Sequence, residues 1–102
     1  MHPIIESHRE AIHELCRAHR VKDLYLFGSA VEGGFQAASD IDFVVSFDEQ
    51  LDPIEHGTQF LRLKEALELL LQRDVDLLIE RAIKNPVLRN AIDGHKALLY
   101  AA

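Results

Sequence analysis

The residues best suited to chemistry in this sequence are a Gly-Ser pair and two aspartates downstream of it. Gly28-Ser29 is separated by ten residues from Asp40-Ile41-Asp42, which gives the pattern Gly-Ser-x10-Asp-x-Asp. If Asp40 and Asp42 lie on a strand, both carboxylates leave the same face, with Cα atoms about 7 Å apart. Hard oxygen ligands of this kind select Mg2+ or Mn2+. The pattern therefore predicts a site for divalent cations.

The Gly-Ser pair predicts that the same site binds an anion. A glycine at position 28 allows a tight backbone turn directly after the apolar run that precedes it. Ser29 then stands where a short helix can begin, so that free backbone N–H groups and a hydroxyl face a bound anion. We therefore expect a phosphate cradle next to the carboxylates.

A third acid is available on a later apolar segment. Asp74 and Asp76 share one face of this segment, whereas Val75 and Leu77 take the other face. If the segment pairs beside the strand of Asp42, one of its two acids can complete the cluster. Burying an unpaired carboxylate costs free energy, and a bound metal ion would offset that cost.

Hydrophobic periodicity predicts the elements that must position these acids. A period near 3.6 indicates helices, and a period of two or a short continuous apolar run indicates strands. We expect helices over 4–20, 54–72 and 86–92, strands over 24–27, 41–47 and 75–79, and a turn or short helix over 30–39. Residues 97–100 could form a closing strand or a docked tail. The order α-β-α(short)-β-α-β-α predicts an α/β (α+β) fold, a small mixed sheet flanked by helices, as one domain over 1–102.

Composition narrows the function classes. Among 102 residues, 11 are Lys or Arg and 17 are Asp or Glu, and the resulting charge of −6 makes nucleic acid a poor main partner. The start, MHPIIESHRE, is not expected to be a signal peptide. No apolar run approaches the roughly 18 residues of a membrane helix. The single Cys16 predicts a reducing compartment, so we expect a cytoplasmic protein without a membrane partner.

Other conspicuous residues are expected to be structural. The six His residues lack the spacing of metal ligands, and Cys16 falls on the apolar side of the first helix. The Leu-rich run over 61–71 should pack against the sheet, although its breadth leaves room for a homo- or hetero-oligomer surface. A group of cations near the end of the sequence forms a solvated face or meets an acidic partner or a nucleotide: Arg81, Lys84, Arg89 and Lys96.

Three segments resemble a known superfamily. Gly28-Ser29, the run Ser39-Asp40-Ile41-Asp42-Phe43-Val44-Val45, and Val75-Asp76-Leu77 are similar to the nucleotidyltransferase superfamily that includes the polymerase β palm. In size and layout the chain resembles the minimal nucleotidyltransferases (MNT), the antitoxin partners of HEPN-domain toxins in two-gene modules. The resemblance covers nearly the whole chain.

The resemblance implies a role for each matched residue. Gly28 and Ser29 would hold the triphosphate of ATP. Asp40 and Asp42 would bind two Mg2+ ions. Asp76 would be the third catalytic acid, bound to the catalytic metal and placed to help deprotonate the acceptor hydroxyl. The implied enzyme is an Mg2+-dependent nucleotidyltransferase that moves AMP from ATP to a hydroxyl, a Tyr of a HEPN toxin in this family, with pyrophosphate leaving.

One segment departs from the family pattern. Members commonly carry Arg within the six residues that begin with Gly-Ser, and this chain has Ala30 and Glu32 there. The change removes a cation that could neutralise phosphate and adds an anion. Two alternatives therefore stay open. One is an antitoxin that neutralises its partner by binding, with little or no catalysis. The other is a small-molecule nucleotidyltransferase with a separate acceptor-binding subunit.

Overall fold

The computed structural model describes residues 3–28 and 40–102, so Ser29 and the predicted turn over 30–39 lie outside the described part. The elements are α1 (Pro3–Ser7), α2 (Arg9–Ala18), β1 (Val21–Phe27), β2 (Ile41–Phe47), α4 (Pro53–Leu71), β3 (Val75–Ile79), the 3-10 helix η1 (Glu80–Ala82), α5 (Pro86–His95) and β4 (Ala97–Ala101). The strands form one sheet in the order β3-β2-β1-β4. β2 and β3 are parallel, and β1 is antiparallel to both of its neighbours. The predicted small mixed sheet flanked by helices is confirmed.

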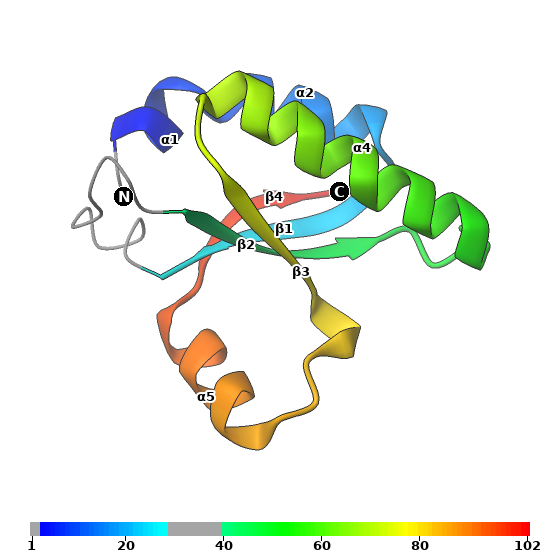
Figure 1. The fold of residues 1–102 in the computed structure, drawn as a ribbon, viewed down its shortest axis with the longest axis vertical. Helices are drawn as coiled ribbons and strands as arrows, with labels where there is room; N and C mark the ends of the chain where they lie inside the picture. Colours follow the sequence, from blue (N-terminus) through cyan, green and yellow to red (C-terminus); the bar gives the residue numbers. More distant parts are fainter. Residues whose placement is uncertain (1–2, 29–39) are drawn as a thin grey trace.

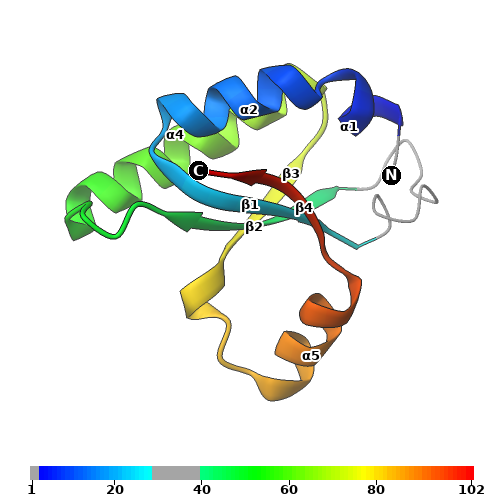
Figure 2. The ribbon, with the colours of Figure 1, turned by 180° about the vertical axis from the view of Figure 1, so that it is seen from behind.

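The sheet has one face covered by helices and one face that is more open. α1, α2 and α4 lie together on one side, and α5 lies on the opposite side (Figure 1). The view from behind shows the same division, with β4 and β1 toward the viewer (Figure 2). Chemistry that needs access to the sheet must therefore take place on the side of α5.

Within the described residues, no helix is both long and apolar enough to cross a membrane.

Strand periodicity decides which side chains enter the core. Ile41, Phe43 and Val45 of β2 are fully buried in the cluster beneath the helices, together with Leu63 and Leu67 of α4. Successive side chains of a strand point to opposite faces, so Asp42 points to the open face. The predicted packing of the Leu-rich run against the sheet is confirmed, while Leu61 and Leu69 of this run are exposed.

The predicted first helix over 4–20 is wrong in one respect, because it is two helices. α1 ends at Ser7 and α2 begins at Arg9, with His8 between them at φ −111° and ψ 12°. The Ser7 hydroxyl donates to the Ile4 carbonyl at 3.2 Å, and His8 Nδ1 lies 2.7 Å from the same oxygen. These two polar side chains compete with the backbone for the Ile4 carbonyl, and the helical hydrogen bonding is interrupted there.

The boundaries of the later elements follow recognisable capping residues. Asp52 caps α4, where its carboxylate accepts from the Glu55 N–H at 2.8 Å. Asn85 caps α5 in the same way. The strands over 41–47 and 75–79 have the predicted bounds, and residues 97–101 form a closing strand rather than a docked tail. The predicted last helix over 86–92 ends three residues early, since α5 continues through Gly94 to His95.

Candidate active site

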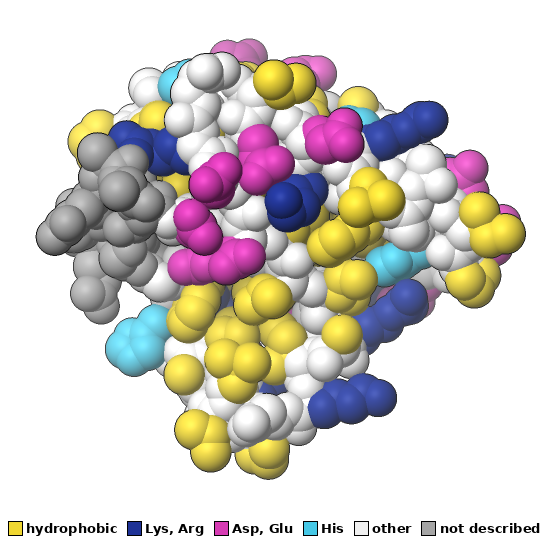
Figure 3. Space-filling view, viewed as in Figure 1, with side chains coloured by type: hydrophobic (Ala, Val, Ile, Leu, Met, Phe, Trp, Pro, Cys, Tyr) yellow, Lys and Arg dark blue, Asp and Glu magenta, His cyan; other side chains and the backbone are white. Residues whose placement is uncertain are grey.

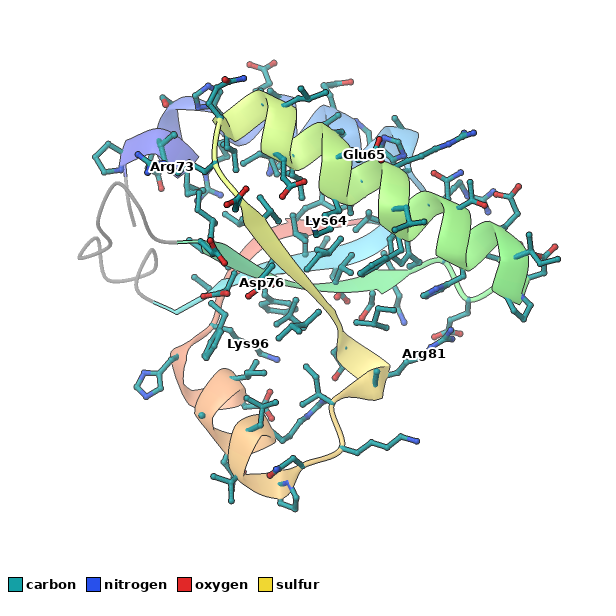
Figure 4. All side chains as sticks on the ribbon, in the orientation of Figure 1. Lys64, Glu65, Arg73, Asp76, Arg81 and Lys96 are labelled. Carbon is teal, nitrogen blue, oxygen red and sulfur yellow. The ribbon has the colours of Figure 1, made fainter. Side chains whose placement is uncertain are left out.

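Two of the predicted acids meet across neighbouring strands. Asp42 of β2 and Asp76 of β3 are direct partners in the parallel register, so their side chains leave the same face of the sheet. The two carboxyl groups are close enough to act on each other electrostatically. Figure 4 shows Asp76 on the side of the sheet that faces α5. The long connection through α4 thus places two acids side by side that are far apart in the sequence.

The carboxyl group of Asp42 is held in an unfavourable setting for an anion. Burial raises its pKa above the ordinary value, and repulsion from Asp76 and Asp40 raises it further. A cation between these groups would remove the repulsion, so the pair fits a divalent metal ion.

Asp40 lies at the margin of the pair. It directly precedes β2 and is exposed, yet it is near enough to repel Asp42. Among residues 3–28 and 40–102, no three His, Cys, Asp or Glu side chains are gathered closely enough to form a metal-binding group. The structure therefore brings Asp42 and Asp76 together and leaves Asp40 beside them.

Gly28 closes the site next to Asp42. Phe27, the last residue of β1, is the register partner of Asp42, and Gly28 follows with φ of +83°. A Cβ built on Gly28 would lie 2.8 Å from Oδ2 of Asp42, closer than any ordinary contact. A residue with a side chain would have to adopt a disfavoured left-handed conformation and displace the carboxylate. The predicted tight turn after a buried strand is confirmed at Gly28, whereas Ser29 lies outside the described residues.

Asp74, the other candidate for the third acid, contributes to strand pairing through its backbone. Asp74 precedes β3, and its carbonyl accepts from the Ile41 N–H at 3.0 Å, which starts the β2–β3 pairing. Its side chain is exposed, and the register partner of Asp42 is Asp76. Asp76 is thus the acid that this fold joins to Asp42.

One residue that positions the site was missed by sequence reasoning. The carboxylate of Glu68 on α4 accepts from the Val75 N–H at 3.1 Å and lies 3.3 Å from Lys64 Nζ. The hydrogen bond from Val75, followed by the effect of Lys64, lowers the pKa of Glu68. Glu68 thereby fastens α4 to the residue before Asp76. The Lys64–Glu68 spacing of four residues was visible in the sequence, but the contact with Val75 was not.

The surface near the pair combines charge and apolar area. Figure 3 shows acidic side chains gathered between α4 and the near edge of the sheet, with an apolar area beyond them toward α5. A separate cavity of about 450 Å³ lies at the other end of β1 and is lined by Arg17, Arg20 and Lys22, among others. These three cations are already paired with acids: Glu14, Asp48 and Glu49. The acidic pair is the stronger candidate for chemistry.

The fold and the site together define a class of protein. A helix-backed mixed sheet carries paired carboxylates on its open face, with a glycine turn beside them, which suits metal-assisted chemistry at phosphate groups. The family model for polymerase β nucleotidyltransferases matches residues 10–102. The chain belongs to this nucleotidyltransferase family. The predicted superfamily and enzyme class are confirmed.

Relatives of similar length carry more specific names. A provisionally assigned protein adenylyltransferase of Methanocaldococcus jannaschii is 34% identical over 90 residues, which cover 88% of this chain and 85% of the relative. The protein adenylyltransferase MntA of Thermococcus cleftensis is 32% identical over 89 residues, covering 87% of this chain and 83% of MntA.

Solved structures show the same fold. A protein provisionally assigned as a minimal nucleotidyltransferase is 34% identical with a TM-score of 0.72, covering 91% of this chain and 90% of that one. A chain of a toxin–antitoxin crystal structure with AMP-PNP is 29% identical with a TM-score of 0.71. The match covers 92% of this chain and 73% of that one. A chain in the complex of tri-AMPylated Shewanella oneidensis HEPN toxin with MNT antitoxin is 26% identical with a TM-score of 0.60. The match covers 95% of this chain and 72% of that one.

Proposed function

We propose that this protein transfers AMP from ATP to a hydroxyl of a HEPN-domain toxin and so acts as the antitoxin of a toxin–antitoxin pair. The observation that carries the proposal is that Asp42 and Asp76 are register partners beside Gly28, on the open face of the sheet. The relatives named protein adenylyltransferase and the AMPylated toxin bound to an MNT antitoxin support the acceptor class. We also propose that the fold acts as one domain, in the cytoplasm.

The residues of the site would have separate roles in binding the metal ions and in binding the nucleotide. Asp40, Asp42 and Asp76 would hold Mg2+, two ions in our proposal, and Gly28 with Ser29 would hold the phosphates of ATP. Mg2+ held by these acids would supply positive charge that stabilises the phosphate oxygens and the entering and leaving oxygens. Asp42 and Asp76 supply fixed negative charge on rigid strands, which orients what binds there. The absence of a Cβ at Gly28 keeps the backbone within reach of the same space.

The reaction that this arrangement serves is a substitution at the α-phosphorus. The acceptor hydroxyl oxygen forms a bond to the α-phosphorus, the bond from that phosphorus to the bridging oxygen breaks, and pyrophosphate leaves with the electron pair. The hydroxyl proton passes to a carboxylate, for which Asp76 is best placed because its side chain is exposed beside Asp42. The products are an AMP ester of the toxin hydroxyl and pyrophosphate.

Mass spectrometry of the partner tests the proposal. The chain is co-expressed with the HEPN-domain protein encoded next to it, and the intact mass of the partner is measured. Transfer adds about 329 Da per AMP, an increment fixed by the chemistry of phosphoryl transfer. We expect the increment with the native chain and its loss with Asp42→Asn or Asp76→Asn. Asp74→Asn is the matched control, since its side chain is exposed and Asp74 is not the register partner of Asp42.

The alternatives give different results in the same experiment. Neutralisation of the toxin that survives Asp42→Asn with no change in mass would show that the chain acts by binding alone. Modified small molecules together with an unmodified partner would show a small-molecule nucleotidyltransferase. Loss of transfer in Asp74→Asn but not in Asp76→Asn would exchange the roles that we propose for these two acids.

A further inference from the structure

A lysine completes a row of residues that crosses the whole sheet. Asp76, Asp42 and Phe27 are successive register partners on β3, β2 and β1. On the far side of β1, Leu26 pairs with Ala97, so the same register continued by one residue places Lys96 beside Phe27. Cross-strand partners point to the same face, so Lys96 belongs to the face of the two acids. Figure 4 shows Asp76 and Lys96 on the α5 side of the sheet.

The present contacts of Lys96 confirm this orientation. Its Nζ lies 4.4 Å from the centroid of the Tyr25 ring and 3.1 Å from Oδ1 of Asp93. Tyr25 is two residues before Phe27 and therefore shares its face. The Lys96 side chain is only 25% exposed, whereas most lysines are well exposed. The ammonium group is thus held against the open face rather than extended into solvent.

Lys96 can leave Asp93 without leaving that acid unpaired. Oδ2 of Asp93 lies 3.5 Å from Nε of Arg89, so a second cation stays beside this carboxylate. The lysine stem is flexible and its charge is a compact point, which allows it to turn toward a new anion on the same face. Two strand spacings, about 10 Å, separate the backbone at Lys96 from that at Asp42. This distance leaves room for phosphate groups between the ammonium and the acids.

The sequence shows why a cation from the residue before β4 is needed here. Between Gly28 and Asp40 the chain has no Lys or Arg, and it carries Glu32. A nucleoside triphosphate brings several negative charges into a site that already holds Asp42 and Asp76. Metal ions at the acids neutralise only the phosphates that they reach, and a cation at the other end of the row would bind the remainder.

We propose that Lys96 binds the β- or γ-phosphate of the nucleotide and replaces the cation that the Gly-Ser segment lacks. The inference rests on the proposed function, since it assumes that the acidic pair binds a nucleoside triphosphate with Mg2+. It adds a specificity determinant for the phosphate chain, supplied from the opposite edge of the sheet.

Calorimetric binding of α,β-methylene-ATP and of AMP, each with Mg2+, tests this role. We expect Lys96→Met to weaken binding of the triphosphate analogue about tenfold, the usual effect of removing a charged hydrogen bond. Binding of AMP, which lacks the β- and γ-phosphates, should be unchanged. Lys96→Arg should restore most of the affinity. The matched control is Lys84→Met, a lysine exposed on the segment before α5.

Each other outcome overturns the inference in a distinct way. A Lys96→Met variant that binds the triphosphate analogue as tightly as the native protein disproves the phosphate contact and leaves the proposed function intact. An equal loss for the analogue and AMP, with a lower melting temperature, shows that Lys96 only stabilises the end of α5 through Tyr25 and Asp93. A native protein that binds neither ligand with Mg2+ overturns the proposed function together with this inference.

Discussion

At the scale of single residues, Gly28 and Asp42 share one small volume. The chain turns at Gly28 in the left-handed region, and the space that a Cβ would fill holds the Asp42 carboxylate. The carboxylate in turn stands against Asp76, at a position where its negative charge is disfavoured. Substitution of Gly28 should therefore lower stability and activity together, whereas substitution of Asp42 should lower activity without lowering stability.

Gly28→Ala should weaken both folding and transfer. The new methyl group meets Asp42 at 2.8 Å, and alanine at φ +83° is strained, so unfolding should become easier by about 1–2 kcal/mol. AMP transfer should fall by at least tenfold, because the carboxylate must turn away. Urea denaturation and the partner-mass assay measure the two effects. As a control, Gly57→Ala in α4 meets no atom within 4 Å and should stabilise the helix by about 0.5–1 kcal/mol.

Asp42→Asn should separate activity from stability. The amide removes a charge that burial and two neighbouring acids disfavour. We expect the free energy of unfolding to stay equal or rise, while transfer falls about a hundredfold or more because electrostatic stabilisation of the transition state is lost. A marked loss of stability in urea would show that the ionised carboxylate holds the fold together.

At the scale of elements, the site depends on how α4 is attached to β3. Glu68 accepts from the Val75 N–H at the point where β3 begins, one residue before Asp76. At the other end of α4, His56 is buried and packs edge-on against Phe47, with ring centroids 4.9 Å apart. The helix is therefore fixed to both parallel strands, once at each end.

Glu68→Ala should loosen the start of β3. The loss leaves the Val75 N–H without this acceptor, so the melting temperature should fall by a few degrees and transfer should fall with it. Glu65→Ala, an exposed glutamate on the same helix, is the matched control and should change neither. Equal melting temperatures for the two variants would show that Glu68 contributes nothing to the junction.

His56 should make the attachment of α4 sensitive to acid. Burial, followed by the charge of Arg81, lowers its pKa below the ordinary value of 6.5. The unfolded chain then binds a proton that the folded chain resists, so this contribution to stability is lost as pH falls below about 6.5. Melting temperatures at pH 7.5 and 5.5 should differ less in His56→Gln than in the native protein. His95→Gln, at an exposed site, should keep the native difference.

The elements that the sequence predicted well are those governed by local pattern. β2 and β3 were predicted to the residue because apolar side chains alternate along β2 and because β3 is apolar except for Asp76. The interruption at His8 was missed, since it depends on competing hydrogen bonds to the Ile4 carbonyl. The pairing of the last strand with β1 depends on contacts between residues more than 70 positions apart, as in Tyr25 with Leu98, which no local pattern encodes.

The residues of the candidate site were likewise predictable from local pattern only in part. Spacing alone singled out Gly28 and Asp42 and left Asp74 and Asp76 as candidates for the third acid, because strand parity determines which face an acid occupies. The family resemblance favoured Asp76. The choice between Asp76 and Asp74 required the parallel register, which pairs Asp42 with Asp76. Lys96 could not be assigned from the sequence, since its neighbour Phe27 is known only once β4 is placed against β1.

At the scale of the whole molecule, the helical layer protects the core. Cys16 of α2 is fully buried, and burial raises the pKa of its thiol to about 12. The formal charge of −6 includes the acids of the site, so bound Mg2+ would make the protein less anionic than its sequence indicates.

Cys16 should report on the opening of this layer. A maleimide at pH 8 should label the native protein at least a hundredfold more slowly than the urea-unfolded chain, because both burial and the raised pKa suppress the thiolate. Full labelling in urea should reach one group per chain, as the sequence has one cysteine. Rapid labelling without urea would mean that α2 detaches readily from the sheet.

The row from Asp76 through Asp42 and Phe27 to Lys96 also has a consequence for folding. It takes one residue from each of three strands and one from the entry to β4, so no shorter portion of the sheet contains the whole row. Strand pairings of such large sequence separation form slowly, because closing the long intervening loop costs entropy. A chain that has collapsed but has not yet added β4 would therefore lack the cation end of the row. Competence to hold a triphosphate would appear only with the finished fold, in a single step.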